Sequence, residues 1–335
     1  MKKLLLVTLL VICIVALYAM NKNSFSEKAD YTFVVAGDDR VLPTDVSPDT
    51  PSTANLYHLQ RMYKEIAQLK PLPKYLFFNG DLVMGYCDTI LLAKELKAWI
   101  KIFKESPLGA TNIKLVVIAG NHEVDGAGKV SNAANERTFV REMKEYIRGN
   151  NGPTMGGADN FSSDQHELTY SFDFGGDHFV VFNTDPAKPG DRVPLHWMEK
   201  DIKTAHENGA RHIFLFGHDP AKPPHYMIGN VAYHDEYGAR RDSMWNMMGK
   251  YGCTVYFGSH FHTWDSISGK PWEIICGNGG AHLDKDWKQS YYGYTLINAY
   301  SKVDVTSIGH NIDNAKYRAA TPDSLTVVKA KFTIE

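Results

Sequence analysis

The stretch KLVVIAGNHE, residues 114–123, contains two signals that decide the fold. Its first part, Lys114–Ile118, is rich in apolar and β-branched side chains, which predicts a strand buried in a sheet. Gly120 follows, and after it come the polar side chains Asn121-His122-Glu123. Because glycine permits a sharp turn, the side chains behind it can point toward a site beyond the end of the strand.

The same order of strand, glycine and polar side chain recurs at four other places in the chain. The four runs are Tyr31–Ala36, Tyr75–Phe78, Ile213–Phe216 and Thr254–Phe257. The clusters after them are Gly37-Asp38-Asp39-Arg40, Gly80-Asp81, Gly217-His218 and Gly258-Ser259-His260-Phe261-His262. In an open α/β sheet, ligands bind at the carboxyl ends of the strands. We therefore expect all five clusters to face one shared centre.

Strand and helix patterns alternate in the first third of the chain, which is typical of a parallel sheet covered by helices. Helical spacing of apolar residues is found in Asn55–Leu69 and from Leu92 to Phe103. The segment Glu123–Arg137 is rich in Gly, Asn and Ala and is predicted to be a loop. The later elements are predicted as helices at Thr138–Arg148, Leu195–Glu207 and Ser243–Tyr251, a hairpin of Leu168–Phe174 with His178–Asn183, and strands at Trp272–Cys276, Tyr294–Asn298 and Val303–Ile308.

Composition places the chain among soluble globular proteins. Of its 335 residues, 44% are hydrophobic and 22% are charged, which excludes a disordered or collagen-like chain. The formal net charge is −2 and no basic stripe is visible, so we expect no nucleic-acid partner. Four widely spaced cysteines form no disulfide framework. No protein partner is indicated.

The N-terminal segment predicts export. Lys2 and Lys3 precede an apolar run from Leu4 to Met20, which is typical of a secretory signal. The run is also near the lower length limit for a membrane span, so an uncleaved anchor is the alternative. We expect residues 1–20 to be a signal peptide or anchor and residues 21–30 a linker. Either outcome places the remaining chain in the periplasm or outside the cell, with membrane contact only through this segment.

The polar clusters supply one set of residues that suits metal ions. Carboxylates and imidazoles together favour borderline divalent cations. The six candidate ligands are Asp38, Asp81, Asn121, His218, His260 and His262. Because side chains alternate along an extended segment, the two histidines of the last cluster would point to one side and Phe261 to the other. Six ligands suffice for two ions that share one carboxylate.

In these motifs the chain resembles the calcineurin-like metallophosphoesterases. The family pattern is Asp-x-His, Gly-Asp, Gly-Asn-His-Asp/Glu, a lone His and Gly-x-His-x-His, in that order, and the last four motifs match here, each after a strand. The resemblance covers about residues 31–310, expected as one phosphoesterase domain, with residues 311–335 as a C-terminal extension that includes a strand. It implies an α/β fold: a β-sandwich of two mixed sheets flanked by helices, with the late strands forming the second sheet.

The resemblance also implies roles for individual residues. Asp81 would bridge two divalent or trivalent ions, of Mn, Fe, Zn or Mg. Asn121, His218 and His260 would complete one ion site, and Asp38 with His262 the other. His122 would act beside the substrate as general acid or charge stabiliser.

The activity implied is hydrolysis of a small-molecule phosphate ester, by attack of a hydroxide that bridges the metals. A phosphomonoester is the favoured substrate. The alternatives are a phosphodiesterase of the same superfamily and a non-catalytic module that binds metal or phosphate.

The chain departs from the family pattern at Arg40, where relatives usually carry a metal-ligating histidine. A guanidinium has no lone pair to offer, so Arg40 cannot be a ligand. It would either weaken the first metal site or bind a phosphate oxygen, for which its geometry is suited. The tyrosine found in purple acid phosphatases three residues after the bridging aspartate is Met84 here. His225 and His234, in the loop after His218, are candidates for lining the substrate pocket.

Overall fold

The computed structural model describes residues 30–41, 54–187, 193–227, 238–284, 291–310, 312–313, 318–319 and 326–335. The predicted signal or anchor and nearly all of the predicted linker lie outside these residues. Within the described residues, none of the helices combines the length and the apolar character that a bilayer crossing requires.

The described elements alternate between helices and strands through most of the chain. The helices are α2 (Ala54–Gln68), α3 (Thr89–Glu105), α4 (Asn121–Val124), α5 (Ala133–Met143), α6 (Leu195–Glu207) and α7 (Gly238–Lys250), with 3₁₀ turns η2 (Lys144–Tyr146) and η3 (His225–Met227). The longer strands are β1 (Tyr31–Ala36), β2 (Tyr75–Asn79), β3 (Lys114–Ile118), β4 (Tyr170–Phe174), β5 (Asp177–Val181), β6 (Ile213–Phe216), β7 (Val255–Gly258), β8 (Trp264–Ile267), β9 (Trp272–Cys276), β10 (Tyr292–Ala299), β11 (Val303–His310) and β14 (Val327–Ile334). The short strands β12 (Ile312–Asp313) and β13 (Arg318–Ala319) pair with each other.

The strands form two mixed six-stranded sheets, as the resemblance implies. The first sheet has the order β14-β11-β10-β1-β2-β3, and the second has the order β4-β5-β6-β7-β9-β8. Within the first, β1, β2 and β3 are parallel, and within the second, β5, β6, β7 and β9 are parallel. The functional clusters therefore follow parallel strands in both sheets.

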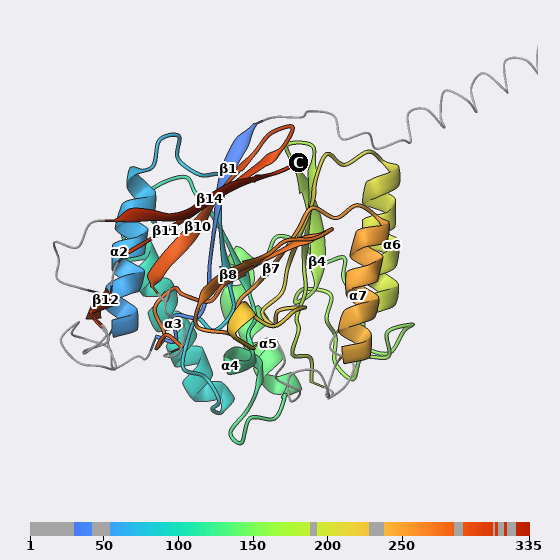
Figure 1. Ribbon diagram of the computed structural model, residues 1–335. Helices are drawn as coiled ribbons and strands as arrows, with labels where there is room; N and C mark the ends of the chain where they lie inside the picture. Colours follow the sequence, from blue (N-terminus) through green and yellow to red (C-terminus); the bar gives the residue numbers. More distant parts are fainter. Residues whose placement is uncertain are drawn as a thin grey trace, which may run out of the picture.

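Helices cover the outer faces of the two sheets. Figure 1 shows α2 and α3 on one side, α6 and α7 on the other, and the sheets between them. Side chains of β1 alternate between two apolar clusters: Val34 packs with the helices of the first sheet, while Phe33 and Val35 lie between the sheets. Phe33 and Phe77 meet Phe216 there, with the rings of Phe77 and Phe216 stacked at a centroid distance of 4.0 Å. The predicted architecture is confirmed.

The expectation that the late strands form the second sheet is wrong for β10 and β11. β10 pairs antiparallel with β1, from Tyr31 opposite Ala299 to Val35 opposite Thr295, and β11 pairs with β10. β14, from the predicted C-terminal extension, pairs with β11 in the same sheet. The alternation of side chains along a strand indicates which side chains share a face. Both faces of each sheet pack against apolar side chains, so the alternation does not identify the neighbouring strand.

The predicted loop at Glu123–Arg137 is also wrong at both ends. α4 begins at Asn121, and α5 begins at Ala133 rather than at Thr138. The side chain of Asn132 accepts a hydrogen bond from the amide of Ala134 and so caps the longer helix. β8 was not predicted, and α7 begins before the predicted Ser243.

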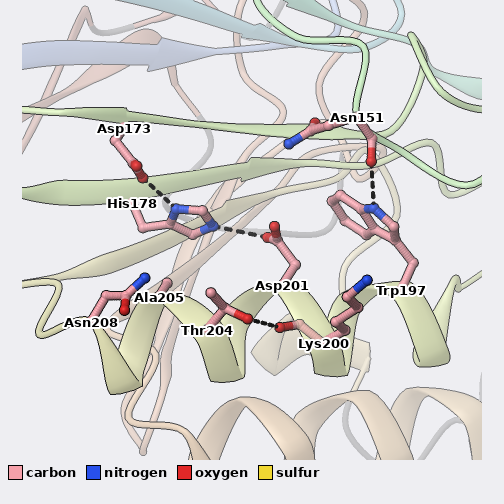
Figure 2. A pocket seen from close by; sticks show the side chains of 9 residues that line it. All are labelled: Asn151, Asp173, His178, Trp197, Lys200, Asp201, Thr204, Ala205 and Asn208. Carbon is pink, nitrogen blue, oxygen red and sulfur yellow. Dashed lines mark hydrogen bonds and ion pairs between the residues drawn. The ribbon is translucent and has the colours of Figure 1, made fainter. Parts of the chain in front are cut away.

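A charged cluster lies between β4, β5 and α6, beside a cavity of about 320 Å³. Figure 2 shows the ring of His178 held between two carboxylates. Its Nδ1 lies 2.6 Å from Asp173 and its Nε2 lies 2.8 Å from Asp201. Burial alone would lower the pKa of His178, but the hydrogen bonds that its ring donates to both aspartates outweigh burial and raise the pKa to about 9. The buried imidazolium therefore ties the helix to the sheet.

This ion triad predicts a pH-dependent stability. Because the pKa of His178 is higher in the folded than in the unfolded chain, its contribution is complete below about pH 6.5 and is lost as the pH rises through 9. The free energy of unfolding should fall over this range by at most about 3 kcal/mol, at about 1.36 kcal/mol per pKa unit. Urea unfolding of wild type and His178→Gln at pH 6, 7.5 and 9 measures the difference. The prediction is contradicted if the free energy of unfolding changes with pH by the same amount in both proteins.

Candidate metal centre

The five polar clusters meet at the carboxyl ends of β1, β2, β3, β6 and β7. Asn79, at the end of β2, links the two sheets at this point: its side-chain amide donates to the carbonyls of Gly217 at 2.8 Å and Phe257 at 2.9 Å. The ends of strands from different sheets are thereby held together. Candidate residues that are up to about 220 positions apart in sequence come into contact, as in the 2.8 Å hydrogen bond from the amide of His260 to Asp38.

The first group of candidate ligands consists of Asp38, Asp81 and His262, with ligand atoms all within 4.8 Å of one another. Asp38 Oδ1 and His262 Nε2 are 3.5 Å apart, and both are buried without a hydrogen-bond partner. The other ring nitrogen of His262 donates to the carbonyl of His282 at 2.5 Å. This hydrogen bond fixes the tautomer, so the lone pair on Nε2 faces Asp38.

The second group consists of His218, Asp219 and His260. His218 Nε2 lies 3.3 Å from His260 Nδ1, 3.0 Å from Asn121 Oδ1 and 3.2 Å from Asp81 Oδ1. Ligand atoms about 2.0–2.2 Å from one ion are about 3.0–3.5 Å from each other, so these spacings fit a single cation. His218 Nδ1 donates to the carbonyl of Asn79 at 2.9 Å, so Nε2 is the ring nitrogen that faces the centre.

Asp81 connects the two groups. It belongs to the first group, and its Oδ1 lies 3.2 Å from His218 Nε2 in the second. Its side chain is fully buried. The orphaned atoms of the first group and the ligand spacing of the second both fit a pair of cations that share this carboxylate.

The pKa shifts agree with a centre that needs positive charge. Burial raises the pKa of Asp38 to about 7, so its ionised form requires a cation facing it. Burial lowers the pKa of His260, and burial together with Arg40 lowers the pKa of His262 to about 3. Both imidazoles are therefore neutral at pH 7, the form that binds metals. Burial alone would raise the pKa of Asp81, but the neighbouring His218, His122 and Arg40 hold it well below its usual range. Burial alone would lower the pKa of His218, but Asp81 raises it well above its usual range, so a cation in the second group would take the place of the proton on Nε2.

The backbone at the centre is strained. Asp38, Arg40, Asp81 and His260 have positive φ angles of 58°, 58°, 52° and 65°. Such conformations persist only where surrounding contacts impose them, and they gather at functional sites. Here the amide of Asp38 donates to the carbonyl of Gly80 at 3.1 Å, and the amide of Arg40 donates to that of Asp81 at 2.9 Å. The two strand ends thus hold each other in place.

Gly80 cannot be replaced without disturbing the second group. Its φ is +86°, and a Cβ built on it would lie 2.3 Å from His218 Nδ1. The motif Gly80-Asp81 therefore serves two purposes, since the glycine makes room for one ligand and turns the chain to present the next.

His122 lies at the rim of the centre rather than in either ligand group. Its Nδ1 donates to the carbonyl of Met84 at 2.6 Å, and its Nε2 lies 3.6 Å from Asp81 Oδ2. Its ring contacts that of Tyr86 at a centroid distance of 4.0 Å, and the Tyr86 hydroxyl in turn contacts the amide of Asn121. Burial lowers the pKa of His122 to about 4. Its Nε2 donates a proton only when the ring is imidazolium.

Arg40 points its guanidinium at the shared carboxylate. Nη2 lies 3.1 Å and Nε 3.3 Å from Asp81 Oδ2. The Arg40 side chain is 24% exposed, whereas Asp81 is fully buried. The guanidinium therefore reaches Asp81 from the side of the centre that is open to solvent.

Of the two histidines predicted to line a substrate pocket, the structure describes His225, which stands apart from the ligand groups. The amide and Nδ1 of His225 are bound by Asp265 at 2.7 and 2.9 Å, and among the described residues His225 makes no hydrogen bond or ion pair with either group. His234 lies outside the described residues.

Two residues of the centre were not predicted from the sequence. Asp219 belongs to the second group, and its Oδ1 lies 3.5 Å from His260 Nδ1. Its position directly after His218 was the available signal. Glu123, quoted only as part of a motif, accepts hydrogen bonds from the amides of Asp81, Val83 and Gly120 at 3.0, 3.0 and 2.9 Å. It holds the loops that carry the ligands.

The double-sheet fold and the paired ligand groups are those of phosphoesterases that work with two metal ions. The chain belongs to the calcineurin-like phosphoesterase family, whose sequence model matches residues 31–264. The resemblance found in the motifs is confirmed.

Individual relatives are distant. Purple acid phosphatase 15 of Arabidopsis thaliana is 24% identical over 179 residues, which are 51% of this chain and only 30% of that protein. The purple acid phosphatase PPD1 of yellow lupin (Lupinus luteus) superposes with a TM-score of 0.61 at 15% identity, over 90% of this chain and 54% of that one. A dimetal phosphatase of Danio rerio superposes with a TM-score of 0.56 at 10% identity, over 90% of this chain and 99% of that one. At these identities the two structures establish a shared fold.

The shared carboxylate gives a direct prediction. Asp81→Asn should lower metal content at both groups and remove most activity, because one charge serves two cations. Metal analysis by mass spectrometry after dialysis against Mn²⁺ measures the content. Asp164→Asn, a half-exposed carboxylate bound by His166, is the matched control and should retain wild-type content. Unchanged metal in Asp81→Asn would refute a shared ligand.

Proposed function

We propose that the protein hydrolyses phosphate esters with two bound cations. The observation that supports this most strongly is the arrangement around Asp81, where one buried carboxylate joins two ligand groups. Bound cations would supply Lewis acidity, lowering the pKa of water and neutralising charge that develops on the phosphoryl oxygens. No nucleophilic side chain is required.

The residues around the centre would position the ester and manage its proton. His122 Nε2 faces the same side of Asp81 as Arg40, at 3.6 Å from Oδ2. An imidazolium at this place can give its proton to the departing alkoxide oxygen. The carbonyl of Met84 holds Nδ1–H, so Nε2 is the nitrogen that delivers the proton.

A phosphomonoester is the proposed substrate class. A monoester carries up to two negative charges, and its non-bridging oxygens suit a guanidinium. Arg40 offers such a cation, partly exposed, at the open side of the centre. A phosphodiester has one charge fewer and gains less from it.

Export is part of the proposal. It is supported by Lys2 and Lys3 in front of the apolar run Leu4–Met20. Expression of the full chain in a bacterial host, followed by fractionation and N-terminal sequencing, tests it. Protein that begins near residue 20 in the periplasm, or full-length protein in the membrane fraction, would support export, and full-length protein in the cytoplasm would argue against it.

The activity is tested with protein stripped of metal and reloaded with Mn²⁺ or Zn²⁺. We expect turnover of p-nitrophenyl phosphate that depends on the added metal and exceeds turnover of bis-p-nitrophenyl phosphate. Faster cleavage of the diester would make the protein a phosphodiesterase. Metal binding without turnover of any ester would support the non-catalytic module instead.

The proposed acid predicts a dependence on leaving group. His122→Ala should lower kcat by about 10²–10⁴-fold for alkyl phosphates, the usual contribution of a general acid, and by much less for p-nitrophenyl phosphate. Its metal content should stay near that of wild type. Because the pKa of His122 is about 4, the ratio of wild-type to variant kcat/KM should grow as the pH falls toward 4. His206→Ala, an exposed histidine on α6, is the control. An equal loss for both esters would exclude the acid role.

A further inference from the structure

The two ligand groups differ in what already occupies the shared carboxylate. Asp81 Oδ1, on the side of the second group, accepts a 3.1 Å hydrogen bond from the amide of His122 and lies 3.2 Å from His218 Nε2. Oδ2, the oxygen left for the first group, is held by the guanidinium of Arg40 at 3.1 and 3.3 Å. The guanidinium, which is always charged, therefore already binds the oxygen that would have to coordinate the first-group ion.

The remaining atoms of the first group are poised for a cation but do not hold one another. Asp38 Oδ1 and His262 Nε2 have no hydrogen bond although both are buried. Asp38 Oδ2, in contrast, is held by the Ser259 hydroxyl and the amide of His260. The carboxylate is thus oriented with one oxygen anchored and the other presented to the centre.

Arg40 cannot move away as a whole, because its backbone is tied to the segment that follows β2. The amides of Arg40 and Val41 donate to the carbonyls of Asp81 and Leu82, each at 2.9 Å. Only the side chain, at 24% exposure, is able to leave Asp81 Oδ2. It would do so toward the open side of the centre, where an ester must enter.

We propose that Arg40 couples the binding of the first-group ion to the binding of a phosphate oxyanion. Without an oxyanion, the guanidinium neutralises Asp81 Oδ2 and repels the first-group ion. When an oxyanion binds, it accepts the guanidinium's hydrogen bonds and frees Oδ2 for the ion. On Asp81 Oδ1 the second group meets an amide and the ring of His218, itself a candidate ligand, but no guanidinium, so this group is filled first. This inference rests on the proposed function and adds an order of binding to it.

The size of this coupling can be measured from either ligand. An oxyanion that frees Oδ2 must raise the affinity of the first-group ion by the same factor by which that ion raises the affinity of the oxyanion. Couplings of this kind are typically about 5–150-fold. A cation that bridges oxyanion and protein directly also couples the two, so the test must isolate the part that depends on Arg40.

The experiment measures Mn²⁺ binding by equilibrium dialysis to the metal-free protein, with and without inorganic phosphate below its precipitation limit. Wild type should bind one ion tightly and a second at least about tenfold more weakly, as expected for competition with charge-assisted hydrogen bonds. Phosphate should strengthen only the second ion. In Arg40→Met the second ion should bind more tightly without phosphate, and the effect of phosphate should shrink severalfold.

Arg141→Met, at an exposed arginine paired with Glu142 on α5, is the matched control and should behave as wild type. Thermal melting verifies that each variant is folded. Two equally tight ions in wild type, or the same phosphate effect in wild type and Arg40→Met, would overturn the coupling while leaving a two-ion centre intact. Failure of the protein to bind any Mn²⁺ or Zn²⁺ would instead overturn the proposed function.

Discussion

The centre of this protein is organised around a fully buried carboxylate, that of Asp81. A buried carboxylate is costly unless opposite charge and hydrogen bonds surround it, and here every nearby element contributes one or the other. His218 comes from the second sheet, His122 from the turn after β3 and Arg40 from the turn after β1. The strained turns, the glycine that makes room for an imidazole and the bonds between the sheets all follow from bringing these groups to one carboxylate.

The two oxygens of Asp81 lie in unequal surroundings. One oxygen faces an amide and a histidine that can serve as a metal ligand, whereas the other is neutralised by a guanidinium that cannot coordinate a metal. The side with the guanidinium is also the side on which His122 Nε2 lies. Part of the positive charge at the shared carboxylate is therefore supplied by the chain itself, through the partly exposed side chain of Arg40.

The sequence predicted the centre better than it predicted the sheets. Asp38, Asp81, His218 and His260 could be expected to meet because each follows a buried strand, and the carboxyl ends of such strands share an edge. Asp219 was missed because an aspartate after a histidine is ordinary in a loop, and only the position of β6 brings it to His260. The partners of β10 and β11 were missed because pairing depends on contacts distant in sequence, which side-chain alternation does not encode. The role proposed for Arg40 could be inferred only once the structure showed its guanidinium beside Asp81.

The central claim is that two cations share Asp81, and anomalous diffraction tests it most directly. Crystals grown with Mn²⁺ and inorganic phosphate, measured at the manganese absorption edge, should show two peaks about 3.5–4 Å apart. One peak should lie among His218, His260 and Asn121, the other beside Asp38 and His262, with Asp81 contacting both. A single peak that Asp81 does not contact, or no peak at these residues, would contradict the account.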